Sequence, residues 1–197
     1  IATAEANAKM YRIVACPTAG SCGILPSVLA AVSEEVNATM NDMTRALFTA
    51  GAIGRVVAEK ASIAGAVGGC QAECGTACAM AAAAAVDLLG GTADEMENAF
   101  ALALKNILGL VCDPIGGLVE VPCVKRNGFH AIHALVAVEM VMNGVKSQVP
   151  ADEVIEAMAD VGRRLPVELK ETSRAGLAMT ETGKRVQAKL DEKAKEI

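Results

Sequence analysis

The sequence is poor in aromatic side chains: it has no tryptophan, one tyrosine and three phenylalanines among 197 residues. Hydrophobic residues nevertheless make up 53% of the chain, so the core must be built mainly from Ala, Val, Leu, Ile and Met. Small side chains let helices approach one another closely, and a chain of this length suits one domain. We therefore expect a single all-α domain over residues 1–197, packed around a buried, Ala- and Gly-rich central helix.

The chain also lacks an excess of basic residues. Its formal net charge is −5, whereas a nucleic-acid-binding surface normally shows clustered Lys and Arg. The most apolar stretch, residues 61–91, contains Glu73 and Asp87 and has no flanking basic cluster. A charge near the centre of a membrane span costs roughly 2.5–3.5 kcal/mol on insertion scales. We therefore expect no nucleic-acid partner and no membrane insertion.

No secretory signal is visible at the start of the sequence, because residues 1–5 show no basic segment followed by an apolar run. The seven cysteines are odd in number and lie mostly in apolar surroundings, which does not favour a disulfide framework. We therefore expect a cytoplasmic protein. The absent initiator methionine suggests that the sequence is one piece of a longer chain.

Apolar periodicity and helix-end signals predict the helices. Asn41 and Asp42 are candidate N-caps, and Thr92 to Glu95 has the pattern of a capping box. Between Val111 and Asn127 several prolines and glycines interrupt the pattern, which predicts a shaped loop. Helices are expected at about 42–60, 71–89, 92–110, 129–142, 150–164 and 180–195.

Three cysteines, Cys70, Cys112 and Cys123, lie beside glycine or proline. A thiolate that reaches a metal often does so from irregular backbone, whereas a cysteine used only for packing needs no turn beside it. A buried iron–sulfur or zinc site is one interpretation, and burial in the core is the other. Cys74 and Cys78 follow Cys70 at intervals of four on one helix face, so we expect them to be plain core residues.

Residues 16–22, with the sequence Cys-Pro-Thr-Ala-Gly-Ser-Cys, form a second irregular segment. Thr18, Ser21 and the nearby backbone N–H groups could hold an anion at the start of the next helix, or simply cap it. His130 and His133 are spaced i, i+3 and could complete a zinc site with Cys123. A histidine pair on a helix is more often a packing or surface feature.

Three segments together resemble one known family. They are residues 16–26 (CPTAGSCGILP), residues 68–73 (GGCQAE) and residues 109–127 (GLVCDPIGGLVEVPCVKRN). These segments resemble the iron–sulfur-dependent bacterial L-serine dehydratases, and the likeness to the alpha chain of the two-chain type extends over nearly the whole sequence. Family alpha chains carry additional sequence before the position of Ile1, and the serine- and histidine-containing motif of the family belongs to the beta chain.

The resemblance implies a catalytic domain with a 4Fe–4S cluster held by Cys70, Cys112 and Cys123, and it implies that Cys74 and Cys78 are not ligands. The reaction would convert L-serine to pyruvate and ammonia by elimination at the open iron, which acts as a Lewis acid. The partners would be L-serine and a serine dehydratase beta chain, and we expect an oligomer.

The same resemblance leads to assignments for the substrate. Residues 18–21 would position L-serine, partly through backbone N–H groups, and residues 125–127 could steady its carboxylate. Glu73 and Glu120 are candidate acids or bases, or could instead form salt bridges, and the beta chain could also supply the base. The assignments are catalytic for Lys125 and Glu73, and substrate-binding for Thr18, Ala19, Gly20, Ser21, Arg126 and Asn127.

Alternative functions come from different classes. The domain could be a non-catalytic helical module that binds a partner through its apolar surface, or a zinc-binding helical domain. A pyridoxal-phosphate dehydratase ranks last, because that enzyme normally uses an α/β scaffold and the strand periodicity is missing.

Overall fold

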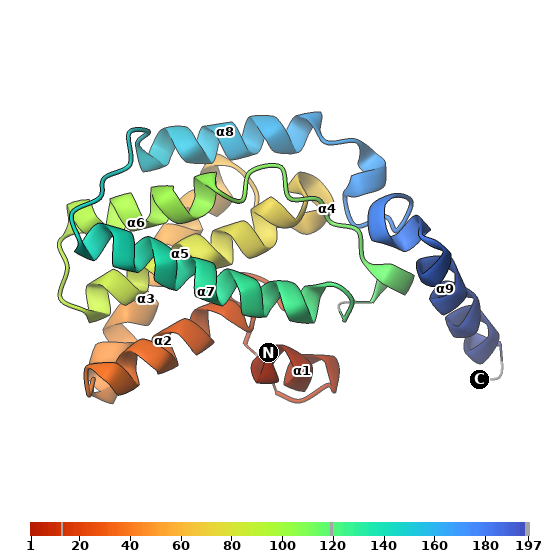
Figure 1. The fold of residues 1–197 in the computed structure, drawn as a ribbon, viewed down its shortest axis with the longest axis horizontal. Coiled ribbons are helices and arrows are strands. Elements are labelled where there is room, and N and C mark those ends of the chain that lie inside the picture. The colour runs from red at the N-terminus through yellow and green to blue at the C-terminus, as the bar shows by residue number, and fades with distance from the viewer. Residues whose placement is uncertain (13, 119, 196–197) are drawn as a thin grey trace.

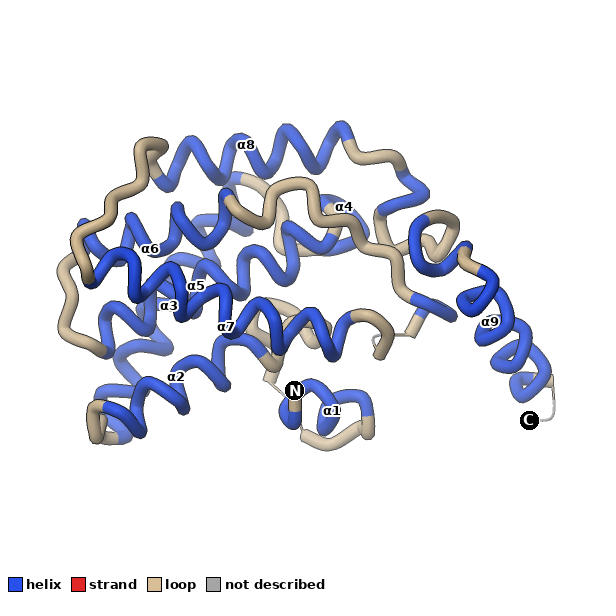
Figure 2. Tube along the Cα trace, in the orientation of Figure 1, coloured by secondary structure: helices blue, strands red, loops and turns tan. Residues whose placement is uncertain are grey.

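A computed structural model describes residues 1–12, 14–118 and 120–195 of the chain. Helices account for the regular structure of these residues, and no strand occurs among them, which confirms the all-α prediction (Figures 1 and 2). The α-helices are α1 (Ala2–Ala8), α2 (Ile24–Glu35), α3 (Met40–Lys60), α4 (Gly65–Gly68), α5 (Thr76–Leu88), α6 (Ala93–Lys105), α7 (Cys123–Met142), α8 (Ala151–Arg164) and α9 (Glu181–Ala194). Within the described ranges, none of these helices has the length and apolar content needed to cross a membrane.

Helix α5 lies at the centre of the fold and packs against α2, α3, α6 and α7 (Figure 1). Its run of alanines, residues 81–85, is inaccessible to solvent. Small residues also bring its neighbours close: a Cβ atom added at Gly54 of α3 would lie only 2.8 Å from the Met80 Cε atom. The predicted buried central helix is therefore confirmed as Ala-rich, with Gly75 in the π-helix that leads into it, and its small side chains allow four helices to pack closely against it.

A π-helix, Gln71–Gly75, leads directly into α5 and was predicted only as ordinary helix. Gln71 is fully buried and ties this segment to its surroundings. Its Nε2 donates to the carbonyl oxygens of Gly68 and Met158, each at 3.0 Å, and its Oε1 accepts from the Gly109 N–H at 2.9 Å. The amide thus joins α4, α8 and the turn after α6, and it fixes the position of the residues around Cys70.

The capping box at Thr92 and Glu95 forms as predicted at the start of α6, but that helix ends at Lys105 rather than near Leu110. The N-cap of α3 is Thr39, not Asn41 or Asp42, because Asp42 serves as the third residue of a second capping box. In both boxes two backbone N–H groups are satisfied by side chains, which is what fixes the helix start.

The start of α7 differs most from the prediction. The helix begins at Cys123, not near Phe129. Pro122 lies at the N-cap position, where the helix needs no N–H donor, so the proline does not interrupt the helical hydrogen bonds. Cys123 therefore lies on a helix rather than on the predicted loop. The predicted end of this helix at Met142 and the expected positions of α8 and α9 are confirmed.

The central helix has no room for larger side chains. We expect Ala83→Leu to lower the free energy of unfolding by about 1–3 kcal/mol, because the added methyl groups must displace packed neighbours. Urea unfolding would measure this loss. The matched variant Ala58→Leu, on the exposed face of α3, should change stability by less than about 0.5 kcal/mol. Equal effects of the two variants would contradict the packing described here.

Candidate metal centre

Cys70, Glu73 and Cys112 form a compact group that could hold a metal ion. One potential ligand atom from each lies within 4.8 Å of the other two. Cys70 directly precedes the π-helix and Glu73 lies within it, while Cys112 comes from the segment between α6 and α7. Both cysteines are buried. The structure thus brings two of the three predicted ligands, Cys70 and Cys112, into one group.

A segment far along the chain holds Cys112 in place. The Cys112 N–H donates to the Leu169 carbonyl at 2.9 Å, and the Cys112 carbonyl accepts from the Glu171 N–H at 2.8 Å. These bonds form a short parallel bridge between Cys112 and Lys170. The residues after α8 therefore determine where the Cys112 thiol lies.

Glu171 is a member of this site that the sequence analysis missed. A Cβ atom added at Gly65 would lie 3.2 Å from Cys112 Sγ, 3.2 Å from Glu73 Oε2 and 3.6 Å from Glu171 Oε2. Two carboxylates and a thiol thus converge on a position that is open because residue 65 has no side chain. No spacing or motif signals Glu171, because its approach depends on the tertiary contact with Cys112.

The environment favours a thiolate at Cys70. Hydrogen bonds from the thiols of Cys112 and Cys74 lower the pKa of Cys70 to about 3, and the positive charge of Arg126 acts in the same direction. The Cys70 and Cys74 sulfur atoms are 3.6 Å apart. The hydrogen bond between Cys112 and Cys70 raises the pKa of Cys112, and burial acts in the same direction. One thiolate surrounded by protonated thiols is a partly prepared metal ligand, since metals bind the deprotonated form.

Cys123 is buried at the first turn of α7. Burial raises the pKa of the Cys123 thiol to about 12, and the negative charges of Cys70 and Glu73 add to this effect. The third predicted ligand is therefore within electrostatic reach of Cys70, although the compact group defined above does not include it. Cys74 and Cys78 are fully buried, as expected for core residues.

Arg126 is held beside the thiols by an ion pair. Its guanidinium lies 2.9 Å from Asp113 Oδ1, and the two side chains are only 17% and 4% exposed. Arg126 also donates to the Val111 carbonyl at 3.1 Å, while Asp113 accepts from the Leu177 N–H at 2.8 Å. This pair braces both sides of Cys112 and places a positive charge near Cys70.

The irregular segment 16–22 lies over Glu73. The Thr18 hydroxyl donates to the Glu73 carboxylate and lies 3.0 Å from the Ser21 hydroxyl. Burial raises the pKa of Glu73 to about 7, opposed by the hydrogen bond from Thr18, while the charges of Cys70 and Glu171 raise it further. The structure therefore brings Thr18, Ser21 and Glu73 together, with Ala19 and Gly20 between the two hydroxyl residues.

Asn127 fastens this segment to α7. Its Oδ1 accepts from the Gly23 N–H at 2.9 Å, and its Nδ2 donates to the carbonyls of Gly20 and Cys123, each at 2.8 Å. Asn127 is 1% exposed. Its amide groups thus hold the loop beside the thiols, a positioning contact that the sequence analysis did not anticipate.

Lys125 lies outside this group. It is exposed and lines a pocket of about 410 Å³ with residues of α1 and with Glu120. His130 and His133 each bring one ring nitrogen to a backbone carbonyl, that of Arg126 at 2.7 Å and that of Ala103 at 3.1 Å. Neither histidine belongs to the metal-binding group found among the described residues.

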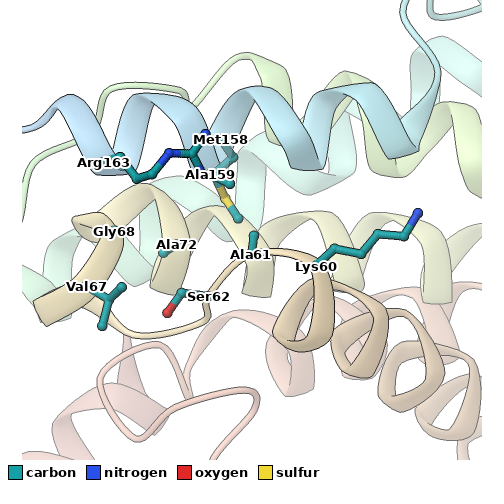
Figure 3. Close-up of a pocket in the computed structure, with 10 residues that line it drawn as sticks. Lys60, Ala61, Ser62, Val67, Gly68, Ala72, Met158, Ala159 and Arg163 are labelled. Atoms are coloured by element: carbon teal, nitrogen blue, oxygen red, sulfur yellow. The ribbon is translucent and has the colours of Figure 1, made fainter.

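Figure 3 shows a separate pocket of about 140 Å³ between the end of α3, α4 and α8. Gly68, Ala72 and Met158 contribute apolar surface to it. The two cationic side chains at the pocket are already paired, Lys60 with Asp152 at 2.8 Å and Arg163 with Asp160 at 3.3 Å. Its described lining contains no cysteine, so it is distinct from the thiol group.

The fold and this site define an all-α domain with a buried thiol and carboxylate centre. Residues 1–178 match the family model of the serine dehydratase alpha chain. The chain belongs to this family.

Curated relatives agree with this assignment. The sequence is 54% identical to a probable L-serine dehydratase, alpha chain, of Bacillus subtilis, over 96% of this chain and 63% of that protein. It is 54% identical to the corresponding protein of Latilactobacillus sakei, over 93% of this chain and 88% of that one. It is 47% identical to the L-serine dehydratase, alpha chain, of Peptoniphilus asaccharolyticus, over 93% of this chain and 63% of that one. The chain thus spans less than two thirds of the first and third of these relatives.

The structure predicts that Asn127 is essential for stability. We expect Asn127→Ala to lower the free energy of unfolding by about 3 kcal/mol, because it leaves buried backbone groups unpaired. Urea unfolding would measure the change, and hydrogen exchange should show faster exchange at the Gly23 amide. Asn143→Ala, which removes exposed bonds to Glu139, should cost less than about 1 kcal/mol. A stable Asn127→Ala protein with a protected Gly23 amide would disprove the positioning role.

Proposed function

We propose that this chain forms the cofactor-binding part of an L-serine dehydratase, which converts L-serine to pyruvate and ammonia. The observation that carries the proposal is the convergence of Cys70, Cys112 and Glu73 beneath the Thr18–Ser21 segment. The printed names of the relatives support the same activity.

The cofactor we propose is a 4Fe–4S cluster with Cys70, Cys112 and Cys123 as its ligands. The donor chemistry fits, because the three thiols are buried and none forms a disulfide. A cluster also suits a set of thiols in which Cys123 lies outside the compact group of Cys70 and Cys112, since each thiol would bind a different iron. When bound, such a cluster supplies a Lewis-acidic iron that polarises the leaving hydroxyl of the substrate.

The residues around the thiols can bind and orient the substrate. Thr18 and Ser21 offer hydroxyl groups, and the backbone N–H groups of Ala19 and Gly20 complete the proposed binding segment. Arg126 contributes positive charge from its fixed position beside Asp113, and Asn127 keeps the segment in register. Lys125 remains a predicted catalytic residue whose side chain lies outside the group described above.

Glu73 is our candidate for moving the proton. Its carboxylate lies between the Thr18 hydroxyl and the thiols, so a substrate bound by Thr18 would lie beside a group that can accept its Cα proton. Loss of that proton and of the β-hydroxyl as water gives aminoacrylate. Aminoacrylate tautomerises to an imine, and water hydrolyses the imine to pyruvate and ammonia without further catalysis.

We propose that a beta chain completes the enzyme, because the relatives are named as alpha chains. The beta chain could also supply the catalytic base. A reducing cytoplasm suits a protein with seven free cysteines and an air-sensitive cofactor.

The ligand assignment can be tested by metal analysis. Anaerobically purified alpha chain with its beta chain should contain about four iron atoms and four sulfides per alpha chain. Cys112→Ser should lose most of both, together with the activity. Cys78→Ser is the matched control, because a serine hydroxyl can keep the bond that Cys78 donates to the His130 carbonyl at 3.2 Å.

Other metal contents would decide between the remaining candidates. One zinc per chain without sulfide would favour a single-metal site built from Cys70, Glu73 and Cys112. A metal-free protein that folds normally and binds the beta chain would favour a non-catalytic module. Loss of the cluster in both cysteine variants would disprove the assignment of ligands.

A second experiment tests the role of Glu73. Glu73→Gln should keep its iron and sulfide but lower kcat by about 10²- to 10⁴-fold, the usual effect of removing a general acid or base. Glu168→Gln, on the exposed short helix just before Glu171, should behave like the original chain. If Glu73→Gln retains kcat within about twofold, the proton must move through another group.

A further inference from the structure

Helix α7 carries a row of large apolar side chains that nothing in the described fold covers. Phe129, Ile132 and Val136 are 79%, 62% and 53% exposed. The opposite face of the helix is buried in the core through Ala134, Val138 and Val141, among others. Figure 1 shows α7 crossing α5 on the near side of the molecule, and α7 packs against both α5 and α6.

The exposed row has the spacing of a coiled-coil seam. Lys125, Phe129, Ile132, Val136 and Glu139 follow one another at intervals of four, three, four and three residues. This alternation keeps side chains on one stripe of a helix and is typical of a surface that packs against a second helix. Single exposed apolar residues need no explanation, but an aligned row of this kind indicates a contact surface.

The charges at the ends of the row make it complementary to itself. Lys125 lies seven residues before Ile132, and Glu139 lies seven residues after it. In an antiparallel pair centred on Ile132, each Lys125 would therefore face Glu139 of the other copy, and Phe129 would pack near Val136. A parallel pair would instead place lysine beside lysine and glutamate beside glutamate. Antiparallel alignment also brings opposite ends of the two helix dipoles together.

We propose that α7 is the contact surface for a second copy of this chain, paired antiparallel about a two-fold axis near Ile132. The surface is isologous, so each residue pair occurs twice. A 20-residue helix is about 30 Å long, and one such pair buries less than the roughly 1,600 Å² of a standard interface. The dimer should therefore dissociate on dilution. The pairing does not depend on the reaction proposed above.

Sedimentation equilibrium of the chain, purified anaerobically, tests for this dimer. Ile132→Asp should remain monomeric at concentrations where the original chain is dimeric, because it places two carboxylates on the axis. Phe48→Asp is the control, since Phe48 is 77% exposed on α3 and should not affect the dimer. Circular dichroism would verify that both variants keep their helical content.

A charge exchange gives a test that does not depend on removing an apolar residue. Lys125→Glu and Glu139→Lys should each weaken the dimer about tenfold or more, because the two-fold axis repeats each like-charge contact at both ends of the seam. The double variant should restore the original dissociation constant.

Several results would overturn the proposal. One is a chain that stays monomeric at all accessible concentrations, and another is a dimer that Ile132→Asp leaves intact. Failure of the double variant to restore the dimer would exclude the antiparallel alignment. A monomer that needs Ile132 to bind the beta chain would show that this surface serves that partner instead.

Discussion

The close approach of helices to α5 is the constraint on which the rest of this structure depends. Because the helix presents mostly alanine to its neighbours, α2, α3, α6 and α7 all pack directly against it. The π-helix that carries Glu73 is continuous with α5, and α7 carries Cys123 at its first turn. Packing around one helix therefore sets the distance between groups that are far apart in the sequence.

The site itself is held by polar contacts that reach in from neighbouring segments. Gln71 joins three elements, Asn127 fastens the loop above Glu73, and the Arg126–Asp113 pair braces the segment that carries Cys112. Each of these side chains satisfies backbone groups or a buried charge, so none can be removed without leaving an unpaired partner. The thiols consequently have little freedom to move apart when they are not bound to a metal.

Local signals in the sequence were enough to predict much of the fold. The capping box before α6 and the expected bounds of α8 depend on residues within one or two turns, and the structure confirms them. The start of α7 was predicted wrongly, because proline and glycine before it signal a loop without showing where the loop ends. The resemblance of three segments to one family correctly gave the family, whereas the assignments of ligands and substrate-binding residues remain predictions.

Contacts between distant segments could not be predicted from the same signals. Nothing in the sequence around Glu171 indicates that it faces Gly65 and Cys112, since this contact forms only after α8 packs against the bundle. Asn127 was interpreted as a substrate ligand because it follows the third cysteine motif, but its donors are taken up by backbone carbonyls. Pattern analysis named segments that lie close together in the structure, but it could not predict the hydrogen bonds that each residue forms.

The two backbone hydrogen bonds between Cys112 and the segment 169–171 tie the position of one proposed metal ligand to the folding of a distant segment. If the chain after α8 detaches, Cys112 loses the contacts that fix its position, and a bound metal loses a preorganised ligand. A metal that bound only the attached form would stabilise it by mass action, so the proposed cofactor and the segment 169–171 would protect each other. Loss of a bound metal to oxygen or a chelator would then first destabilise the segment 169–171, because such a segment opens at a lower free energy than the alanine-packed core.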